Sequence, residues 1–233
     1  GPGSENSFPG VAEAYSDSSP ILVLAGANER STLSVSPNFN SGRTFKTVSK
    51  WSESVLETAQ IPLMMGRAFS LLRSGKGGPV VLEFPKDVML ADFEESEFAY
   101  VPTRRSSPAP ERTAVRDLLD LLLAAKKPIL YAGQGVIYAE AWDELKAFAE
   151  FLQIPVMTSL NGKGAFPENH PLSIGAANGL SRADQVNYFL GAGDLFFGIG
   201  TSFTRSIFIA PFPKGKTFTQ ICMDEGDFNK DYA

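Results

Sequence analysis

The chain has 233 residues, of which 43% are hydrophobic and 20% charged, and a formal net charge of −5, so we expect a soluble globular protein of one large or two small domains. One cysteine, Cys222, and one histidine, His170, exclude an internal disulfide scaffold and a closed zinc site, and we expect no metal ligands within the chain. The excess of acidic residues argues against nucleic acid as a partner. The apolar runs are shorter than the roughly 20 residues of a membrane helix, and the start lacks a signal-peptide pattern. We therefore expect a cytoplasmic protein.

The first half of the chain alternates between helical and strand-like patterns. A helix is expected over 7–16, followed by an apolar run at 20–26 that suits a strand buried on both faces. The polar stretch 28–49 predicts a long loop, a feature that is usually functional or mobile. A helix over 61–73 and a second buried strand over 79–84 complete this block. Two strands are too few for a covered parallel sheet, so the chain looks like the middle piece of a longer protein.

The second half predicts a mostly parallel α/β sheet. A stretch rich in Pro and Ser at 93–110 is typical of a linker between domains. Beyond it, helices alternate with short apolar strands, and this order favours a sheet that carries helices on both faces. The expected elements are helices over 111–125, 139–152 and 182–190, and strands over 128–131, 154–157, 194–199 and 216–223.

Three glycine-containing turns are candidate binding sites. Gly1-Pro2-Gly3 lies just before Asn6, the expected N-cap of the first helix. Two interpretations fit the local spacing equally well: a turn that presents amide hydrogens to a ligand, or a short leader added for expression. Gly133-Gln134-Gly135 resembles the opening of a dinucleotide fingerprint, but Tyr138 stands where the third glycine belongs, so a plain strand-to-helix turn fits equally well. The run 198–202 ends a strand where open α/β sheets bind ligands, or it is a packing turn.

Several segments, taken in order, carry a resemblance to one family. Residues 1–6 and 9–20 resemble a GPGxxN loop, a helix and a D-S-x-P turn; 78–88 resembles a GPVxxxxPKDV strand; and 154–156, 161–164 and 166–171 resemble an IPV, GKG and PxxHP run. Together they resemble the thiamine-diphosphate-dependent enzymes of the acetolactate synthase type. The resemblance covers nearly the whole chain, and the combination is specific although each piece alone is not.

The resemblance implies a fold, a domain organisation and a reaction. Residues 1–92 would be the C-terminal part of the pyrimidine-binding domain and 111–233 the central domain, a six-stranded Rossmann-like sheet of the DHS-like NAD/FAD-binding type, joined by a linker over 93–110. The whole enzyme would be a homodimer or homotetramer that uses thiamine diphosphate and Mg²⁺ to decarboxylate a 2-oxo acid, and it would then transfer or protonate the carbanion. The activating Glu would lie upstream of Gly1 and the Mg²⁺ motif downstream of Ala233, so this chain would contain no catalytic residue and would be inactive alone.

The resemblance also implies binding positions within the chain. Two departures weaken parts of it: Ala27 stands where acetolactate synthases carry Gln, and 200–206 together with Cys222 replace residues that face FAD in the family. We therefore expect FAD only as an alternative ligand. The matching positions are Pro2, Gly3, Asn6, Asn28, Gly133, Gly135, Asn161, Gly200 and Thr201 for cofactors, and Ala27, Phe39, Asn40 and Lys50 for the 2-oxo acid.

Two other interpretations stay open at this point. The chain could be a non-catalytic nucleotide-binding or interaction module of Rossmann type. An NAD-dependent dehydrogenase is disfavoured, because the glycine pattern is incomplete and Met157-Thr158-Ser159 stands where an acidic residue would end the second strand.

Overall fold

The computed structural model describes all residues except 95–100, 103, 105–107, 180–182 and 233. The chain divides into two compact units, Gly1–Pro108 and Ala109–Ala233, and each is described here by itself. Much of the expected linker 93–110 lies outside the described residues. None of the helices within the described ranges is both long and apolar enough to span a bilayer.

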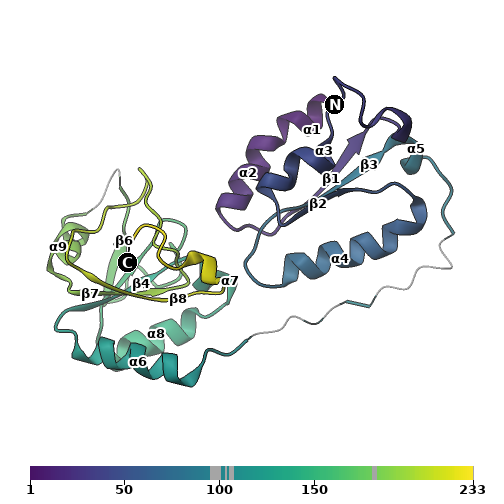
Figure 1. Cartoon of the computed structure of the whole chain (residues 1–233). Helices are drawn as coiled ribbons and strands as arrows, with labels where there is room; N and C mark the ends of the chain where they lie inside the picture. The colour runs from purple at the N-terminus through teal and green to yellow at the C-terminus, as the bar shows by residue number, and fades with distance from the viewer. Residues whose placement is uncertain (95–100, 103, 105–107, 180–182, 233) are drawn as a thin grey trace. The chain divides into compact units, whose positions relative to one another are not determined.

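The first unit is a three-stranded parallel sheet between helices (Figure 1). Its strands are β1 (Leu22–Ala27), β2 (Trp51–Ser54) and β3 (Val80–Pro85), in the order β1-β3-β2. Helix α4 (Ile61–Arg73) packs on one face, and α1 (Pro2–Asn6), α2 (Phe8–Ser16) and α3 (Ser41–Thr44) lie on the other. The remaining elements are α5 (Lys86–Met89) and three 3₁₀ turns, η1 (Arg30–Thr32), η2 (Phe45–Val48) and η3 (Thr58–Gln60).

Successive side chains of β3 point to opposite faces of the sheet and enter the apolar cluster on each face. Val80 and Leu82 face α4 and pack with Val55 and Ala68, whereas Val81 faces the other way and packs with Val11 and Phe45. Successive side chains of a strand point to opposite faces, so the central strand of a doubly covered sheet is apolar on both. The predicted helix 61–73 and the predicted strand at 79–84 are confirmed to within one residue.

Two expectations for this unit were wrong, and the N-cap of a third element is shifted by one residue. Strand β1 is not buried on both faces, because Leu24 is 57% exposed and only Ala25 is buried. It is an edge strand, with only β3 beside it. The segment 28–49 is not a plain loop, since it contains η1, α3 and η2. The helix expected over 7–16 is confirmed to within one residue as α2, but its N-cap is Ser7 instead of Asn6. Asn6 is the last residue of a separate helix, α1, which was not predicted.

The second unit is a five-stranded parallel sheet with helices on both faces (Figure 1). The strand order is β6-β5-β4-β7-β8, with β4 (Pro128–Ala132), β5 (Val156–Thr158), β6 (Ser173–Ala176), β7 (Leu195–Ile199) and β8 (Thr217–Ile221). Helices α6 (Arg112–Ala124) and α8 (Trp142–Leu152) cover one face, and α9 (Asp184–Ala192) covers the other. Short α7 (Gln134–Tyr138) follows β4, and η5 (Glu225–Asp227) follows β8.

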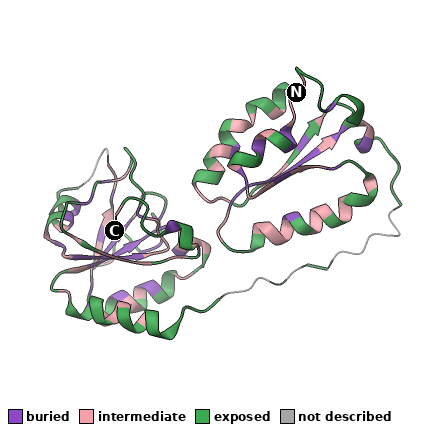
Figure 2. Ribbon diagram, viewed as in Figure 1, coloured by how far each residue is buried: buried purple, intermediate pink, exposed green. Residues whose placement is uncertain are grey.

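This sheet also separates two apolar layers. Leu130 and Ala132 of β4 pack with α6 and α8, whereas Ile129 and Tyr131 pack with α9. The latter layer also holds an aromatic cluster, in which the Tyr131 ring stacks on Phe203 at 5.4 Å between centroids. Figure 2 shows buried residues in the strands of both units.

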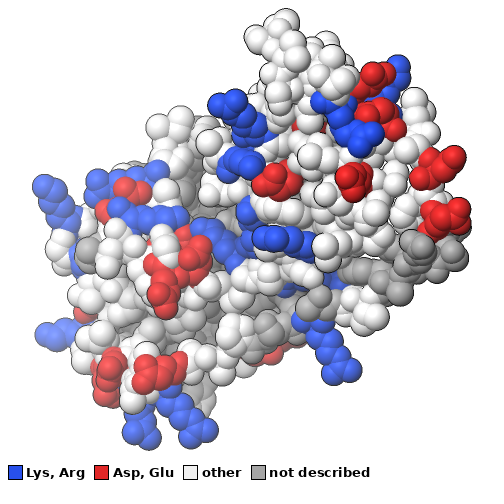
Figure 3. All heavy atoms as spheres, turned by 45° about the vertical axis from the view of Figure 1, so that its right-hand side comes forward, with Lys and Arg blue, Asp and Glu red and all other residues white. Residues whose placement is uncertain are grey.

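The second unit confirms the expected α/β class and corrects some details. The described residues form five strands rather than six, and β6 was not predicted. The helix expected over 139–152 is α8, which begins only at Trp142, because Glu140 adopts a positive φ of 56°. The residues before it, Gln134–Tyr138, form α7, which was not predicted. On the face drawn in Figure 3, basic side chains are interspersed with acidic ones.

Candidate functional site

Helix α1 packs at the carboxyl end of β1. The Ser4 hydroxyl donates to the Gly26 carbonyl oxygen at 3.2 Å, across 22 residues of chain. This bond brings the predicted positions Pro2, Gly3 and Asn6 on α1 to the end of the strand that carries Ala27 and then Asn28. Ala27 is half-buried and the other four are exposed. Sequence reasoning assigned four of these residues to cofactors and Ala27 to the substrate, but it missed Ser4, the residue that joins the two segments.

A clamp made by Arg30 holds the segment that follows β1. The Arg30 Nε lies 2.6 Å from Asp87 Oδ2, its backbone N–H donates to Asp87 Oδ1 at 3.1 Å, and its Nη1 donates to the Leu56 carbonyl oxygen at 2.9 Å. Three chain segments that follow β1, β2 and β3 therefore meet at one guanidinium. Neither Arg30 nor Asp87 was predicted as a site residue, because the contact joins positions 57 residues apart.

We expect the stabilising effect of this clamp to be present at neutral pH and lost in acid. The Arg30 side chain, by its hydrogen bond to the carboxylate, lowers the pKa of Asp87 below its ordinary value. The folded state therefore takes up this proton less readily than the unfolded chain, so the contribution is complete above the unfolded-state pKa and disappears as the pH falls through the folded-state pKa. The measurement is Tm against pH for wild type and Asp87→Asn. The two curves should converge in acid, and a constant gap would contradict this prediction.

The predicted substrate residues Phe39 and Asn40 lie on the sheet, directly before α3. The Phe39 ring is half-buried and packs edge-on against Phe45, with centroids 6.2 Å apart. Asn40 is the N-cap of α3, and its Oδ1 accepts from the Arg43 N–H at 2.7 Å. Both side chains therefore have structural partners, and their place in the segment 28–49 is set by packing.

Lys50 is placed differently from the other predicted substrate residues. Its ammonium donates to three backbone carbonyl oxygens at the end of α4, those of Leu71 and Ser74 at 2.6 Å and of Lys76 at 2.8 Å. An ammonium has three N–H donors, so all of them are used. Partial burial lowers the pKa of Lys50. This geometry favours a structural role for Lys50, as the cap of α4, over contact with a carboxylate substrate.

We expect Lys50→Met to lower the free energy of unfolding by about 2 kcal/mol, because the charged hydrogen bonds to these carbonyl oxygens are lost. The matched control is Lys46→Met. The exposed ammonium of Lys46 pairs with the exposed Glu53 carboxylate at 2.9 Å, and such pairs contribute at most about 1 kcal/mol. Urea unfolding of the three proteins measures both values. Equal effects of the two substitutions would show that the carbonyl contacts of Lys50 add nothing.

The three predicted glycines of the second unit meet where the strand order reverses. Strands β5 and β6 lie on one side of β4, and β7 and β8 on the other, so the switch point falls between β4 and β7. There the Gly133 N–H donates to the Ile199 carbonyl oxygen at 2.8 Å, and the Gly135 N–H donates to the Gly200 carbonyl oxygen at 2.9 Å. Open α/β sheets bind ligands in the crevice outside such a point.

Glycine is required at this crossing. A Cβ on Gly133 would lie 2.2 Å from the Gly200 oxygen, and a Cβ on Gly135 would lie 2.7 Å from the Gly200 Cα. Gly200 itself has a φ of 62°, a conformation that side chains rarely adopt. The two glycine turns are thus packed against each other, which accounts for these glycines without a ligand and leaves the nucleotide site a proposal.

The remaining predicted positions flank the same edge. Asn161 is exposed in the turn after β5, where the neighbouring Gly162 packs on Gly133. Thr201 is half-buried, and its carbonyl oxygen accepts from Gln220 Nε2 at 2.7 Å. Gln220 was not predicted, although it also donates to the Asp227 carbonyl oxygen at 3.0 Å and so joins the segments after β7 and β8.

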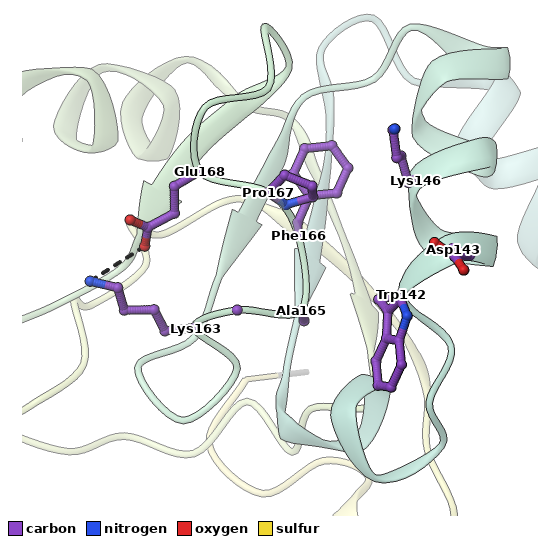
Figure 4. A pocket seen from close by; sticks show the side chains of 9 residues that line it. Trp142, Asp143, Lys146, Lys163, Ala165, Phe166, Pro167 and Glu168 are labelled. Carbon is purple, nitrogen blue, oxygen red and sulfur yellow. Dashed lines mark ion pairs between the residues drawn. The ribbon is translucent and has the colours of Figure 1, made fainter.

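A pocket of about 340 Å³ opens beside α8 (Figure 4). Trp142, Asp143 and Lys146 come from the first turns of this helix, and Phe166 and Pro167 come from the loop after β5. In the same loop Lys163 and Glu168 form an ion pair at 3.4 Å. Two basic and two acidic side chains balance in charge, so the pocket does not select for ligand charge.

The fold and the switch point define an α/β protein of the Rossmann-like class. Residues 115–233, more than half of the chain, match the family model described as the thiamine pyrophosphate enzyme central domain, and the chain therefore belongs to the thiamine pyrophosphate enzymes. The resemblance inferred from the sequence is confirmed.

Curated relatives and a solved structure agree with this family. The chain is 36% identical to the glyoxylate carboligase of Escherichia coli O157:H7, covering 88% of this chain and 35% of the relative. It is 32% identical to the acetolactate synthase large subunit of Lactococcus lactis, covering 99% and 41% respectively. A crystal structure from Mycobacterium smegmatis, assigned to the thiamin diphosphate-dependent enzymes, matches with a TM-score of 0.74 and 27% identity over 97% of this chain and 44% of that one. The chain spans about a third of the length of the first of these relatives.

Proposed function

We propose that this chain is part of a longer thiamine-diphosphate-dependent enzyme that decarboxylates a 2-oxo acid and passes the remaining unit to an acceptor or to a proton. The names of the relatives, glyoxylate carboligase and acetolactate synthase, support this reaction class. The observation that carries the proposal is the junction between Ser4 and Gly26, which gathers Pro2, Gly3, Ala27 and Asn28 at the carboxyl end of one strand.

The residues at this junction fit a cofactor ring. Glycine within a helix costs about 1 kcal/mol relative to alanine, yet a Cβ on Gly3 would meet nothing within 4 Å. The chain itself therefore does not need glycine there, and an external group that approaches the backbone closely would explain it. The exposed amides of Asn6 and Asn28 can donate to such a group. Thiamine diphosphate, when bound, supplies an electron sink for breaking the bond beside the carbonyl carbon.

Other parts of the enzyme are assigned outside this chain. Within the described residues, no cluster of three or more His, Cys, Asp or Glu side chains could hold a metal ion. In this proposal, as the family resemblance implies, the Mg²⁺ ligands and the activating Glu lie in other segments of the longer protein. In this proposal 1–92 belong to the pyrimidine-binding domain, 93–110 to a linker and 111–233 to the central domain, and the enzyme is a cytoplasmic homodimer or homotetramer.

The test is CO₂ release from pyruvate and glyoxylate by the longer protein, with and without thiamine diphosphate and Mg²⁺. We expect release only when the cofactor is present. The matched control is the 233-residue chain under the same conditions, which should release none. A longer protein that is inert with every 2-oxo acid tested would contradict the proposal and favour a non-catalytic module.

A second candidate is nucleotide binding at the switch point, with FAD or a related adenine nucleotide as ligand. The reversal of strand order between β4 and β7 favours it, because open α/β sheets bind ligands in the crevice outside such a point. Cys222 stands where the family carries a ligand-facing Asp, and its Sγ donates to the Asp224 carbonyl oxygen at 3.2 Å, which weakens the case for FAD itself. Thermal unfolding with added FAD, ADP or NAD tests this candidate, since a ligand of the folded state raises Tm. Mass spectrometry of the purified chain would detect a retained nucleotide.

A further inference from the structure

A buried carboxylate lies in the centre of the first sheet. Glu83 is on β3, the middle strand, and it is 0% exposed. The pairing of the strands places Ala25 of β1 and Ser54 of β2 beside it. Burying a carboxylate is costly unless it is hydrogen-bonded, so the partners of Glu83 indicate what it does.

The partners of Glu83 tie α3 to the sheet. Its Oε1 accepts from the Ser41 backbone N–H at 2.5 Å, and its Oε2 accepts from the Ser54 hydroxyl at 2.6 Å. The Ser41 carbonyl oxygen in turn accepts from the Ser52 hydroxyl at 3.3 Å. Both backbone polar groups of Ser41, the first residue of α3, are therefore held by side chains of β2 and β3.

This attachment also orients the residue before it. Asn40 is covalently joined to Ser41, and its Oδ1 is fixed by the Arg43 N–H. Among the residues that the structure describes, the Asn40 Nδ2 has no hydrogen-bond partner, so it is a donor held in a set direction. The segment cannot slide along the sheet, because a Cβ on Gly42 would already lie 2.5 Å from the Ser54 Oγ.

We propose that Glu83 is a positioning residue for the substrate: by holding the Ser41 N–H, it aims the Asn40 amide at the carboxylate of the 2-oxo acid. This inference rests on the function proposed above and on the assignment of Phe39 and Asn40 to the 2-oxo acid, which the family resemblance implies. An N–H donor suits a carboxylate oxygen, and the ring of Phe39 beside it suits the apolar part of a small 2-oxo acid. Glu83 acts through Ser41 and does not touch the substrate itself.

The first experiment measures hydrogen exchange of the Ser41 amide in the 233-residue chain. We expect Glu83→Met, which removes both acceptor oxygens, to speed exchange by at least about tenfold. Glu83→Gln keeps one acceptor oxygen and should stay within about threefold of wild type. Ser41→Ala is the matched control, since it keeps the N–H and removes only a hydroxyl that has no partner. Unchanged exchange in a folded Glu83→Met protein would overturn the anchor.

The second experiment separates KM from kcat in the longer protein. With Glu83→Met we expect KM for the 2-oxo acid to rise at least about tenfold while kcat stays within about threefold, because a contact made equally in ground and transition states is lost. Glu83→Gln should restore KM, and Glu13→Met, the same change at an exposed glutamate on α2, should alter neither value. A wild-type KM in Glu83→Met would overturn the positioning role.

If Glu83→Met does not fold, a variant of Ser41, whose N–H is bound by Glu83, provides the test. Ser41→Pro removes the N–H together with the hydroxyl, which has no partner and whose loss Ser41→Ala measures alone. Proline is tolerated at the first helical residue after an extended one, as Asn40 is, with φ −107° and ψ 101°. It should raise KM as Glu83→Met does, and an unchanged KM would overturn the proposal. If the wild-type longer protein releases no CO₂, the proposed function fails, whereas the exchange result still decides whether Glu83 anchors Ser41.

Discussion

Replacing Phe45 with alanine is expected to destabilise the first unit by about 4 kcal/mol. The ring is 0% exposed and packs against Phe8 at 5.4 Å and Phe39 at 6.2 Å between centroids. It also contacts the cluster of Val11 and Val81, which joins α2 to the central strand. Truncation removes this burial and leaves a cavity that neighbours on a parallel sheet cannot fill by small shifts.

The two tryptophans allow each unit to be followed separately. Trp51 is in the first unit and Trp142 in the second, and the chain has no other. In a Trp142→Phe background, Trp51 fluorescence during urea unfolding measures how much Phe45→Ala lowers the free energy of unfolding of the first unit. The control is Leu63→Ala in the same unit, because Leu63 is 78% exposed and its truncation should change stability by less than about 0.5 kcal/mol. Similar losses from both substitutions would show that the Phe45 ring is not part of the core.

Replacing Gly133 with alanine is expected to destabilise the second unit by about 3 kcal/mol. The new methyl group would lie 2.2 Å from the Gly200 carbonyl oxygen and 2.7 Å from the Thr201 Cβ. The nearest obstacle is backbone, which cannot rotate away as a side chain could, so the turns after β4 and β7 must separate. Separation also breaks the hydrogen bond from the Gly133 N–H to the Ile199 carbonyl oxygen.

Gly191→Ala is the matched control for this substitution. Gly191 lies within α9, and a Cβ there would meet nothing within 4 Å. Alanine in a helix is favoured over glycine by up to about 1 kcal/mol, so this change should stabilise the unit. Trp142 fluorescence during urea unfolding, in a Trp51→Phe background, measures the free energy of unfolding of the second unit for both variants. Two variants of equal stability would contradict the close contact at the switch point.

Elements with a strong local pattern could be predicted from the sequence. The helix at 61–73 and the strands at 79–84, 128–131 and 194–199 differ from the structure by at most one residue at each end. Their apolar residues repeat with the period of the element, and glycine or proline marks their ends, so the signal does not depend on distant residues. The positions of the glycine turns after β4 and β7 follow from the same pattern.

Two short strands, β2 and β6, could not be predicted, because they form only by pairing with neighbouring strands. Trp51–Ser54 has four residues, two of them serine, and becomes β2 only by pairing with β3. Ser173–Ala176 likewise becomes β6 by pairing with β5. The apolar run of β1 gave the opposite error, since hydrophobicity alone does not say whether other elements cover both faces of a strand.

The sequence by itself determined the α/β class, the long helices and central strands, and the family, because periodic burial and motif order are local properties of the chain. Only the tertiary structure decided what single polar side chains do. Lys50 caps α4 and Glu83 holds Ser41 across 42 residues of chain, and both hydrogen bonds depend on where distant segments fold together. A residue type names the bonds that a side chain can make, but its partners are set by packing.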